Sequence, residues 1–458
     1  MELAAVESKN SEKIFRIAVQ CTETRARCGT LLNKTPTPNI ICNTISCALP
    51  LVTPDLLKGD EILKETISRL PIAVPVEDLV LEKDLFHSRK PAQKADAEDY
   101  TLHQHCNVSP STLIFFTPRL CGSIPTGPCN DKQITVESAQ GRRGITVDIY
   151  SSMISSIKAD VNITLCDEVP SGASKNRHDK SVRRTLNWLK ETLKSLRPGF
   201  SPDTSVKTTN NGNGSEPAQK KRKVDAGTPQ IGNMEEKRHV IFGVVLGGTY
   251  EHLRKISAEN TAELPVDGYV LGGFNLGETN EERNRIVAAT TPLLDESKCR
   301  VLKSVNNPID ILDAISCGID LVECDYAYHV SRMCYASTYK IPSIEYTDCK
   351  NFETENPDFC PGDRTKINLR DKRFERDTRA LLPGCKCFTC RSYTRAYINH
   401  LLNAHEMLAD TLLYIHNLYH LQLLVSTARK HVAKGAFGEF VANFVEGQKM
   451  YVVDMGTQ

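Results

Sequence analysis

Short apolar segments alternate with amphipathic segments through much of this sequence, and the alternation limits the folds open to the chain. Between residues 240 and 323, most apolar segments are followed, after a turn, by a stretch with the helical spacing of apolar side chains. Strands that alternate with helices form parallel βαβ units, because the helix carries the chain back to the start of the next strand. We expect strands at 240–245, 268–273, 300–304 and 319–323, and helices at 250–263, 281–294 and 308–316.

The same pattern is present before residue 200. With this many repeats, the predicted fold class is α/β, a (β/α)8 TIM barrel, rather than an open doubly wound sheet. No G-x-G-x-x-G motif follows a strand, so a dinucleotide-binding fold has no support. In this half of the chain we expect strands at 15–21, 39–42, 113–116 and 161–165, and helices at 149–157 and 179–196.

Residues 198–237 interrupt the pattern with a stretch rich in Ser, Thr, Asn, Gly and Pro. Such a stretch cannot bury enough apolar surface to offset its ordering entropy, so we predict a disordered polar insertion. The predicted organisation is then the N-terminal part of the barrel at 1–197, the insertion, and the C-terminal part at 238–458, with a zinc-binding subdomain at about 360–424. Inside the insertion, a basic run resembles a nuclear localisation signal, although a solvated linker is the simpler interpretation: Lys220, Lys221, Arg222 and Lys223.

Bulk properties indicate a chain that works in a reducing compartment. The sequence has 458 residues and 17 cysteines, an odd number, and it begins without the basic and apolar regions of a signal peptide. No apolar run approaches the roughly 18 residues that a bilayer-spanning helix needs. The predicted location is therefore the cytoplasm, with peripheral association with mitochondria and nuclear import as alternatives. The net charge of +1 does not by itself predict a nucleic-acid partner.

A C-x-C-x-x-C motif near the C-terminus supplies most of a metal site. Cys385, Cys387 and Cys390 offer three thiols within six residues, and Zn²⁺ prefers four tetrahedral nitrogen or sulfur ligands. A metal-free cysteine-rich loop or a redox pair is the weaker alternative. The fourth ligand must come from the histidine-rich segment that follows, which offers His400, His405, His416 and His420.

Geometry narrows this choice without deciding it. One straight helix from Cys390 to His416 would rise by about 39 Å, so His416 can serve only if the chain folds back. The residues at 403–406 have the pattern of a helix N-cap with a Glu three residues on, which predicts a break there. Two helices of about twelve residues each would then return His416 to the thiols. His400 or His405 could also reach the metal.

Several segments together resemble the tRNA-guanine transglycosylase family. The resemblance covers nearly the whole chain except the insertion and residues 85–140. It implies a TIM barrel with an inserted zinc subdomain, and exchange of guanine for queuine at the anticodon wobble position, number 34, of tRNAs with GUN anticodons. It also implies that His416 completes one structural zinc site with the three cysteines. The segments that carry it are ARCGTLL (26–32), CDEVP (166–170), IFGVVLGGTYEHLR (241–254), GYVLGGFNLGE (268–278), CGID (317–320), INLRDKRF (367–374) and the cysteine motif with the histidine that stands 26 positions after it.

Three positions depart from the family pattern in separate catalytic roles. The family's nucleophile is an Asp before a Cys, but here Glu323 precedes Cys324. The family's general base has no counterpart, because residues 100–130 contain neither Asp nor Glu. Of the two residues that read guanine, the Asp corresponds to Asp167, whereas the Gln position holds Leu246.

These departures predict a chain that has lost its active site and is not itself an enzyme. By resemblance, it would be the non-catalytic subunit of a heterodimer, pairing with a catalytic subunit near the zinc subdomain and helping to bind tRNA. No catalytic or cofactor-binding residue is then expected. The alternative is an active transglycosylase that uses Glu323 as its nucleophile. A solvated surface is the default interpretation of the basic face of the 179–196 helix, with Arg183 and Arg184. Contact with tRNA phosphates is the alternative hypothesis.

Overall fold

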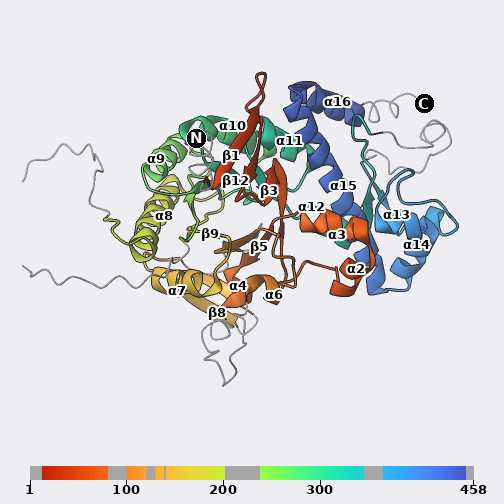
Figure 1. Cartoon of the computed structure of the whole chain (residues 1–458), viewed down its shortest axis with the longest axis horizontal. Coiled ribbons are helices and arrows are strands. Elements are labelled where there is room, and N and C mark those ends of the chain that lie inside the picture. The colour runs from red at the N-terminus through yellow and green to blue at the C-terminus, as the bar shows by residue number, and fades with distance from the viewer. Residues whose placement is uncertain are drawn as a thin grey trace, which may run out of the picture.

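Eight parallel strands close into a barrel at the centre of the molecule (Figure 1). The computed structural model describes residues 13–80, 101–119, 129–138, 141–201, 238–344 and 365–449. The strand order around the barrel follows the chain, and the last strand pairs with the first in parallel register. The prediction of a (β/α)8 barrel is therefore confirmed. The strands are β4 (Asn39–Asn43), β5 (Ile72–Pro75), β6 (Ile114–Thr117), β9 (Val161–Ile163), β10 (Ile241–Val245), β11 (Gly268–Leu271), β12 (Cys299–Leu302) and β13 (Leu321–Glu323).

Alternating side chains along each strand build two separate apolar layers. Phe115 belongs to one buried cluster and meets Phe242 edge to face, with ring centroids 6.1 Å apart. Its neighbour Phe116 belongs to the other cluster and stacks on Tyr150 of a covering helix at 4.9 Å. Because both faces of a barrel strand are buried, its sequence is a continuous apolar run.

Helices cover the outside of the barrel, and most begin and end near the expected residues. The helix predicted at 308–316 has those bounds, and the one predicted at 179–196 begins four residues earlier, at Lys175, after a capping Ser174. The helices up to β13 are α2 (Pro54–Gly59), α3 (Glu61–Ser68), α4 (Val76–Leu79), α6 (Leu102–His105), α7 (Val147–Ile157), α8 (Lys175–Leu196), α9 (Glu251–Ala262), α10 (Asn280–Thr290), the 3-10 turn η1 (Thr291–Leu293) and α11 (Pro308–Ser316).

Two strand predictions need correction. The strand at 15–21 is not part of the barrel: β1 (Phe15–Gln20) pairs antiparallel with β2 (Arg27–Leu31), which pairs with β3 (Thr35–Thr37). Two strands that were not predicted, β7 (Gln133–Ser138) and β8 (Gly141–Thr146), pair antiparallel. Periodicity finds strands but not their partners, since pairing depends on contacts between distant segments.

A buried ion pair attaches the β1–β2–β3 sheet to the barrel. Arg27 on β2 donates from Nε and Nη2 to the two carboxylate oxygens of Asp320, at 2.8 and 2.6 Å. Asp320 lies just before β13, at the N-terminal ends of the barrel strands. The small sheet therefore covers that end, and the opposite end, where TIM-barrel active sites lie, receives the loops after the strands.

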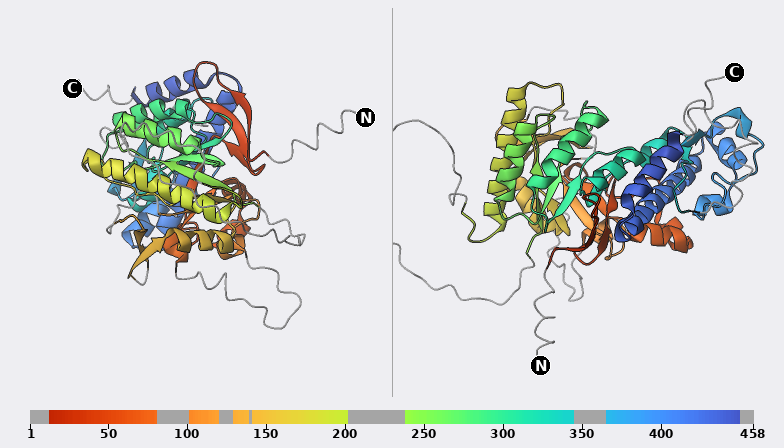
Figure 2. Two further views of the ribbon diagram at one scale, coloured as in Figure 1. Left: turned by 90° about the vertical axis from the view of Figure 1, so that its left-hand side faces the viewer. Right: turned by 90° about the horizontal axis from the view of Figure 1, so that it is seen from above.

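The remaining elements form a helical region beside the barrel. They are α12 (Tyr326–Arg332), β14 (Tyr335–Ser337), β15 (Lys366–Asn368), the 3-10 turn η2 (Lys372–Phe374), α13 (Phe388–Ser392), α14 (Arg395–Asn403), α15 (Met407–Ala433) and α16 (Phe437–Lys449). Figure 2 shows α13 and α14 at one end of the molecule, while the long α15 runs back along the barrel. This region has its own buried cluster, which includes Leu369, Phe374 and Ile398. Among the residues described, no helix is both long and apolar enough to cross a bilayer.

The insertion predicted at 198–237 lies outside the described residues from 202 onward, together with its basic run. The domain boundaries drawn from it remain predictions.

Candidate functional site

Four side chains from two elements converge on one point in the helical region. The ligand atoms of Cys385, Cys387, Cys390 and His416 all lie within 4.8 Å of one another. His416 Nδ1 is 3.9, 3.5 and 3.3 Å from the three sulfur atoms in chain order. A tetrahedral zinc ion, with bonds of about 2.3 Å to sulfur and about 2.0 Å to nitrogen, would separate S and N ligands by about 3.5 Å. The cluster is thus positioned to bind a structural metal ion, and its donor set is one that zinc prefers.

Backbone contacts orient the histidine for this role. His416 is fully buried, and its Nε2 lies 2.9 Å from the carbonyl oxygen of Ser337 on β14. An Nε2–H that donates to this carbonyl leaves the Nδ1 lone pair directed at the thiols. The next residue, Asn417, accepts from the Ser337 amide at 2.7 Å and donates to the Tyr335 carbonyl at 3.0 Å. The His-Asn pair therefore joins α15 to β14 as well as completing the metal cluster.

The other three histidine candidates do not reach the cluster. His400 and His405 are exposed on and after α14. His420 is buried one turn after His416, but its Nε2 faces the Tyr339 carbonyl at 2.8 Å. Burial lowers the pKa of His420 to about 4.

The predicted chain reversal is present, with different detail. α14 ends at Asn403 and α15 begins at Met407, so the break lies where it was expected. The predicted Asn N-cap is wrong, since Asn403 closes α14 and Glu406 precedes α15 without a side-chain cap. The helices are also unequal, with 9 and 27 residues, because α15 continues past the metal cluster to pack along the barrel.

A second group of candidate side chains lies at the C-terminal ends of the barrel strands. Glu323 is the last residue of β13 and is 1% exposed. Burial raises the pKa of Glu323 to about 7, and the carboxylates of Asp325 and Glu168 add to this effect. The positive charge of Lys303 and a hydrogen bond with Asn43 act in the opposite direction. A carboxyl group whose pKa lies this close to neutrality at the end of a barrel strand is typical of active sites.

Lys303 is a residue that the sequence interpretation missed. It follows β12 directly, is 1% exposed, and its Nζ lies 3.4 Å from the carbonyl oxygen of Arg119 in the segment after β6. The sequence does mark this position, because a lysine directly after an apolar strand falls where a buried side chain is expected. The sequence between 100 and 130 offers no acid at the position expected for a general base, and residues 120–128 lie outside the described residues.

Asp167 is at the predicted strand end but is not free. It is 2% exposed, and Arg177 on α8 contacts both of its carboxylate oxygens at 2.7 Å. Arg184 adds a third contact at 3.2 Å. Two guanidinium groups therefore neutralise the carboxylate that, by resemblance, would read guanine.

The loops after β10 and β11 meet beside Asp167 and Glu168. Leu246 is 2% exposed, and a side chain added at Gly272 would meet it at 3.3 Å and meet Glu168 at 3.2 Å. The Gly273 amide donates to Glu168 Oε1 at 3.1 Å. Glycines here let the backbone approach the side chains of two neighbouring strands.

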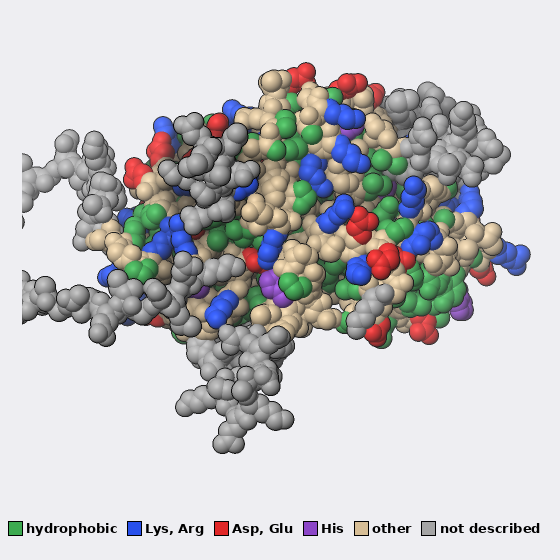
Figure 3. Space-filling model, in the orientation of Figure 1, with side chains coloured by type: hydrophobic (Ala, Val, Ile, Leu, Met, Phe, Trp, Pro, Cys, Tyr) green, Lys and Arg blue, Asp and Glu red, His purple; other side chains and the backbone are tan. Residues whose placement is uncertain are grey.

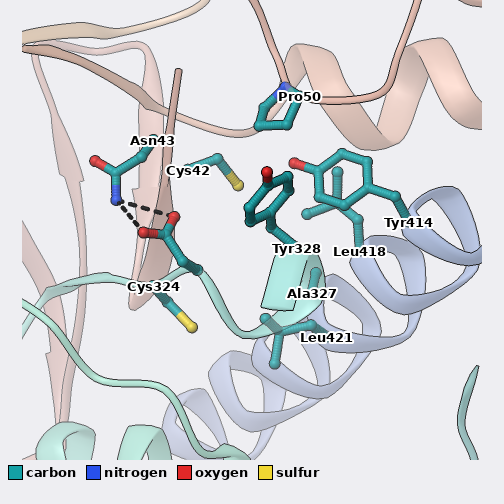
Figure 4. A pocket seen from close by; sticks show the side chains of 10 residues that line it. Cys42, Asn43, Pro50, Cys324, Ala327, Tyr328, Tyr414, Leu418 and Leu421 are labelled. Atoms are coloured by element: carbon teal, nitrogen blue, oxygen red, sulfur yellow. Dashed lines mark hydrogen bonds between the residues drawn. The ribbon is translucent and has the colours of Figure 1, made fainter. Parts of the chain in front are cut away.

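A narrow pocket lies between the ends of β4 and β13 on one side and α12 and α15 on the other (Figure 4). Cys42, Asn43 and Cys324 line its barrel side, and Tyr328 and Tyr414 close the helical side. Asn43 donates from Nδ2 to both oxygens of Asp325 at 3.0 Å. The pocket thus places the end of β13 next to the helix that carries the metal ligand His416.

Comparison with known proteins decides the family. A family model described as queuine tRNA-ribosyltransferase matches residues 23–450. The chain belongs to the queuine tRNA-ribosyltransferase family. The match runs through the barrel and the metal cluster together.

Individual relatives carry the same description. A queuine tRNA-ribosyltransferase of Clostridium perfringens (strain SM101) is 32% identical over 278 residues, which are 61% of this chain and 59% of that protein. Those of Actinobacillus succinogenes and Mannheimia succiniciproducens are each 34% identical over 215 residues, 47% of this chain. The chain therefore spans less than two thirds of the length of these curated relatives.

These findings contradict the prediction that the chain is not an enzyme. The relatives are named as the enzyme itself, and nothing in the comparisons marks an accessory subunit. The prediction took three departures from the family pattern together as the loss of an active site, although one of them replaces a carboxylate with another carboxylate. Glu323 still supplies a buried carboxyl group at the strand end, which is the chemical group that the reaction needs.

Proposed function

We propose that this chain is a tRNA-guanine transglycosylase that exchanges guanine for queuine at the wobble position of tRNA, with Glu323 as its nucleophile. The proposal depends on one observation: a buried carboxyl group at the C-terminal end of β13, in a barrel that matches the queuine tRNA-ribosyltransferase family. By family resemblance, the substrates are tRNAs with GUN anticodons, those for Asp, Asn, His and Tyr.

The chemistry requires a covalent link between protein and ribose. A carboxylate oxygen of Glu323 attacks C1′ of the nucleotide, and the glycosidic bond breaks as its electron pair leaves with guanine. The departed guanine takes up a proton from solvent. The incoming base gives its ring proton to solvent and attacks C1′ with the freed electron pair, which breaks the bond to Glu323 and restores the carboxylate. Glutamate reaches one methylene further than aspartate, so the ribose must bind correspondingly further from the end of β13. The fit matters because a misplacement near 1 Å can cost about 100-fold in rate.

The metal site has a separate, structural role in this proposal. Its four protein ligands leave no position for a catalytic water. When bound, the metal holds α13 against α15 and thereby shapes the region beside the barrel. We propose this region, at about 360–424, as a subdomain inserted in the barrel.

We also propose that the chain works with a second chain of the same family. Apolar side chains are exposed around the α14–α15 turn, close to the metal cluster: Tyr397 is 40%, Met407 85% and Leu408 38% exposed. Apolar groups gathered on one surface are typical of a protein interface. The sequence between 100 and 130 also lacks the acid expected as a general base, so a heterodimeric partner remains part of the proposal.

The decisive test uses the purified chain, a tRNA with a GUN anticodon and labelled guanine. We expect label to enter the tRNA, and we expect a covalent protein–tRNA adduct on a denaturing gel. Glu323→Gln should abolish both. Glu296→Gln is a matched control, since this exposed glutamate lies near the other end of the barrel.

A second arm adds a catalytic family member as partner. Exchange that occurs only with the partner, and that is unchanged by Glu323→Gln, would place the nucleophile in the partner and overturn the assignment made here.

A further inference from the structure

Lys303 and Glu323 occupy facing positions on neighbouring barrel strands. β12 and β13 pair in parallel, with Val301 opposite Leu321 and Leu302 opposite Val322. Lys303 and Glu323 are the next residues along each strand, and both are 1% exposed. The register therefore brings a buried ammonium group and a buried carboxyl group to the same end of the barrel.

A buried lysine needs a reason to be there. Removing an ammonium ion from water costs several kcal/mol unless an opposite charge or hydrogen bonds compensate. The distance from Lys303 Nζ to the Arg119 carbonyl oxygen, 3.4 Å, is long for a hydrogen bond. The carboxyl group of Glu323 contributes compensation, since the charge of Lys303 lowers the pKa of Glu323.

We propose that Lys303 is a positioning residue for the exchange reaction: its ammonium group holds the side chain of Glu323 at the strand end as the carboxylate that attacks the ribose. This inference rests on the proposed function and deepens it. Lys303 keeps its proton throughout the step. The new bond joins a Glu323 oxygen to C1′, and the electron pair of the broken glycosidic bond leaves with guanine.

The charges around Glu323 explain why a cation is needed there. Asp325 from the same segment and Glu168 from the end of β9 both disfavour a further negative charge. Asn43 from β4 favours it by a hydrogen bond, and Lys303 from β12 favours it by its charge. Burial raises the pKa of the nearby Cys166 thiol, and the positive charges of Lys303 and Arg119 both act to lower it. Replacement of Lys303 by a neutral residue would leave Glu323 beside two other acidic side chains without the positive charge of Lys303.

The expected effect can be sized from the pKa of Glu323, which is about 7 in the intact site. Loss of a close opposite charge raises a carboxyl pKa by about one to three units. At pH 7 the ionised fraction would fall from about one half to between about one tenth and one thousandth, so exchange should slow by roughly 5-fold to 500-fold. The loss should appear in kcat and diminish as the pH rises towards 9.

The test compares Lys303→Met and Lys303→Arg with Lys298→Met. Lys298 lies just before β12, so its replacement removes one positive charge from the other end of the same strand. We expect the pH–rate profile of Lys303→Met to be displaced towards higher pH. Lys303→Arg should reverse part of this displacement, and Lys298→Met should show none. An unchanged profile for Lys303→Met would overturn the inference.

A second measurement does not depend on activity. Carbon-13 NMR of glutamate-labelled protein, with the Glu323 signal assigned by its loss in Glu323→Gln, reports the titration of that carboxyl group directly. An upward shift of its midpoint in Lys303→Met supports the positioning role even if the chain alone shows no exchange, in which case only the proposed function fails. An equal midpoint in the two proteins would refute the role of Lys303.

Discussion

Replacement of His416 tests the metal site most directly. His416→Ala removes one of four ligands and leaves the Ser337 carbonyl without its partner at 2.9 Å. An unpaired buried carbonyl costs about 1–3 kcal/mol. Loss of the metal costs more, because structural zinc contributes about 10–16 kcal/mol of apparent binding free energy in small zinc domains at neutral pH.

The same helix provides a matched control in His420. This histidine is also buried, and its ring lies 2.8 Å from a backbone carbonyl, that of Tyr339. His420→Ala therefore deletes an equivalent side chain and hydrogen bond without touching the ligand set. The difference between the two variants isolates the contribution of the metal.

Metal analysis and denaturant unfolding provide the measurements. We expect one zinc per chain in the wild type and in His420→Ala, and substantially less than one in His416→Ala. A chelator should destabilise the first two proteins and have little effect on the third. Full zinc occupancy in His416→Ala, or loss of zinc in His420→Ala, would refute the ligand assignment.

Substitutions elsewhere in the chain test the interface, the buried charges and the tRNA-binding surface. Cys387→Ala should lose zinc and, if the region beside the barrel forms the partner interface, should lose pairing with a second family chain, measured by co-purification; a metal-free variant that pairs normally would refute the interface. Glu323→Gln should stabilise the fold at pH 8 by up to about 3 kcal/mol. The pKa of Glu323 in the folded protein, about 7, lies above its unfolded value, so stability that the wild type has at pH 4 is lost as the pH rises through 7. Urea unfolding of the variant at pH 5 should therefore show a much smaller gain in stability than at pH 8. Asp320→Asn should destabilise by about 3–5 kcal/mol because it leaves the buried Arg27 uncompensated, and a loss below 1 kcal/mol in thermal unfolding would contradict this. Lys180→Glu with Arg183→Glu should weaken tRNA binding and reduce its salt dependence, by about one unit of slope for each phosphate that the helix no longer neutralises. We choose Lys180 in place of Arg184 because Arg184 holds Asp167, and equal slopes would exclude α8 as the tRNA-binding surface.

The tRNA-binding test addresses a weak point of the sequence interpretation. Arg184 was expected to face tRNA, but it contacts Asp167 and Asp131 instead. Arg183 pairs with Asp179 one turn away. On the face shown in Figure 3, basic and acidic side chains are interspersed rather than gathered into one basic field.

Local patterns were sufficient for much of the fold. Apolar runs bounded by turns located seven of the eight barrel strands, and the helix at 308–316 was found with its limits. β5, a strand of four buried residues, was not predicted. The three closely spaced cysteines identified the metal site, because ligands that are neighbours in sequence stay neighbours in space.

The sequence by itself determined the barrel, the metal cluster and the family. Only the tertiary structure showed that Arg177 neutralises Asp167 and that Lys303 faces Glu323. The physical reason is that the first pair depends on how α8 packs against the barrel and the second on strand register, and the energies of both depend on burial. A carboxylate read from sequence is only a residue type; its surroundings decide whether it is neutralised, as Asp167 is, or has a pKa near neutrality, as Glu323 has.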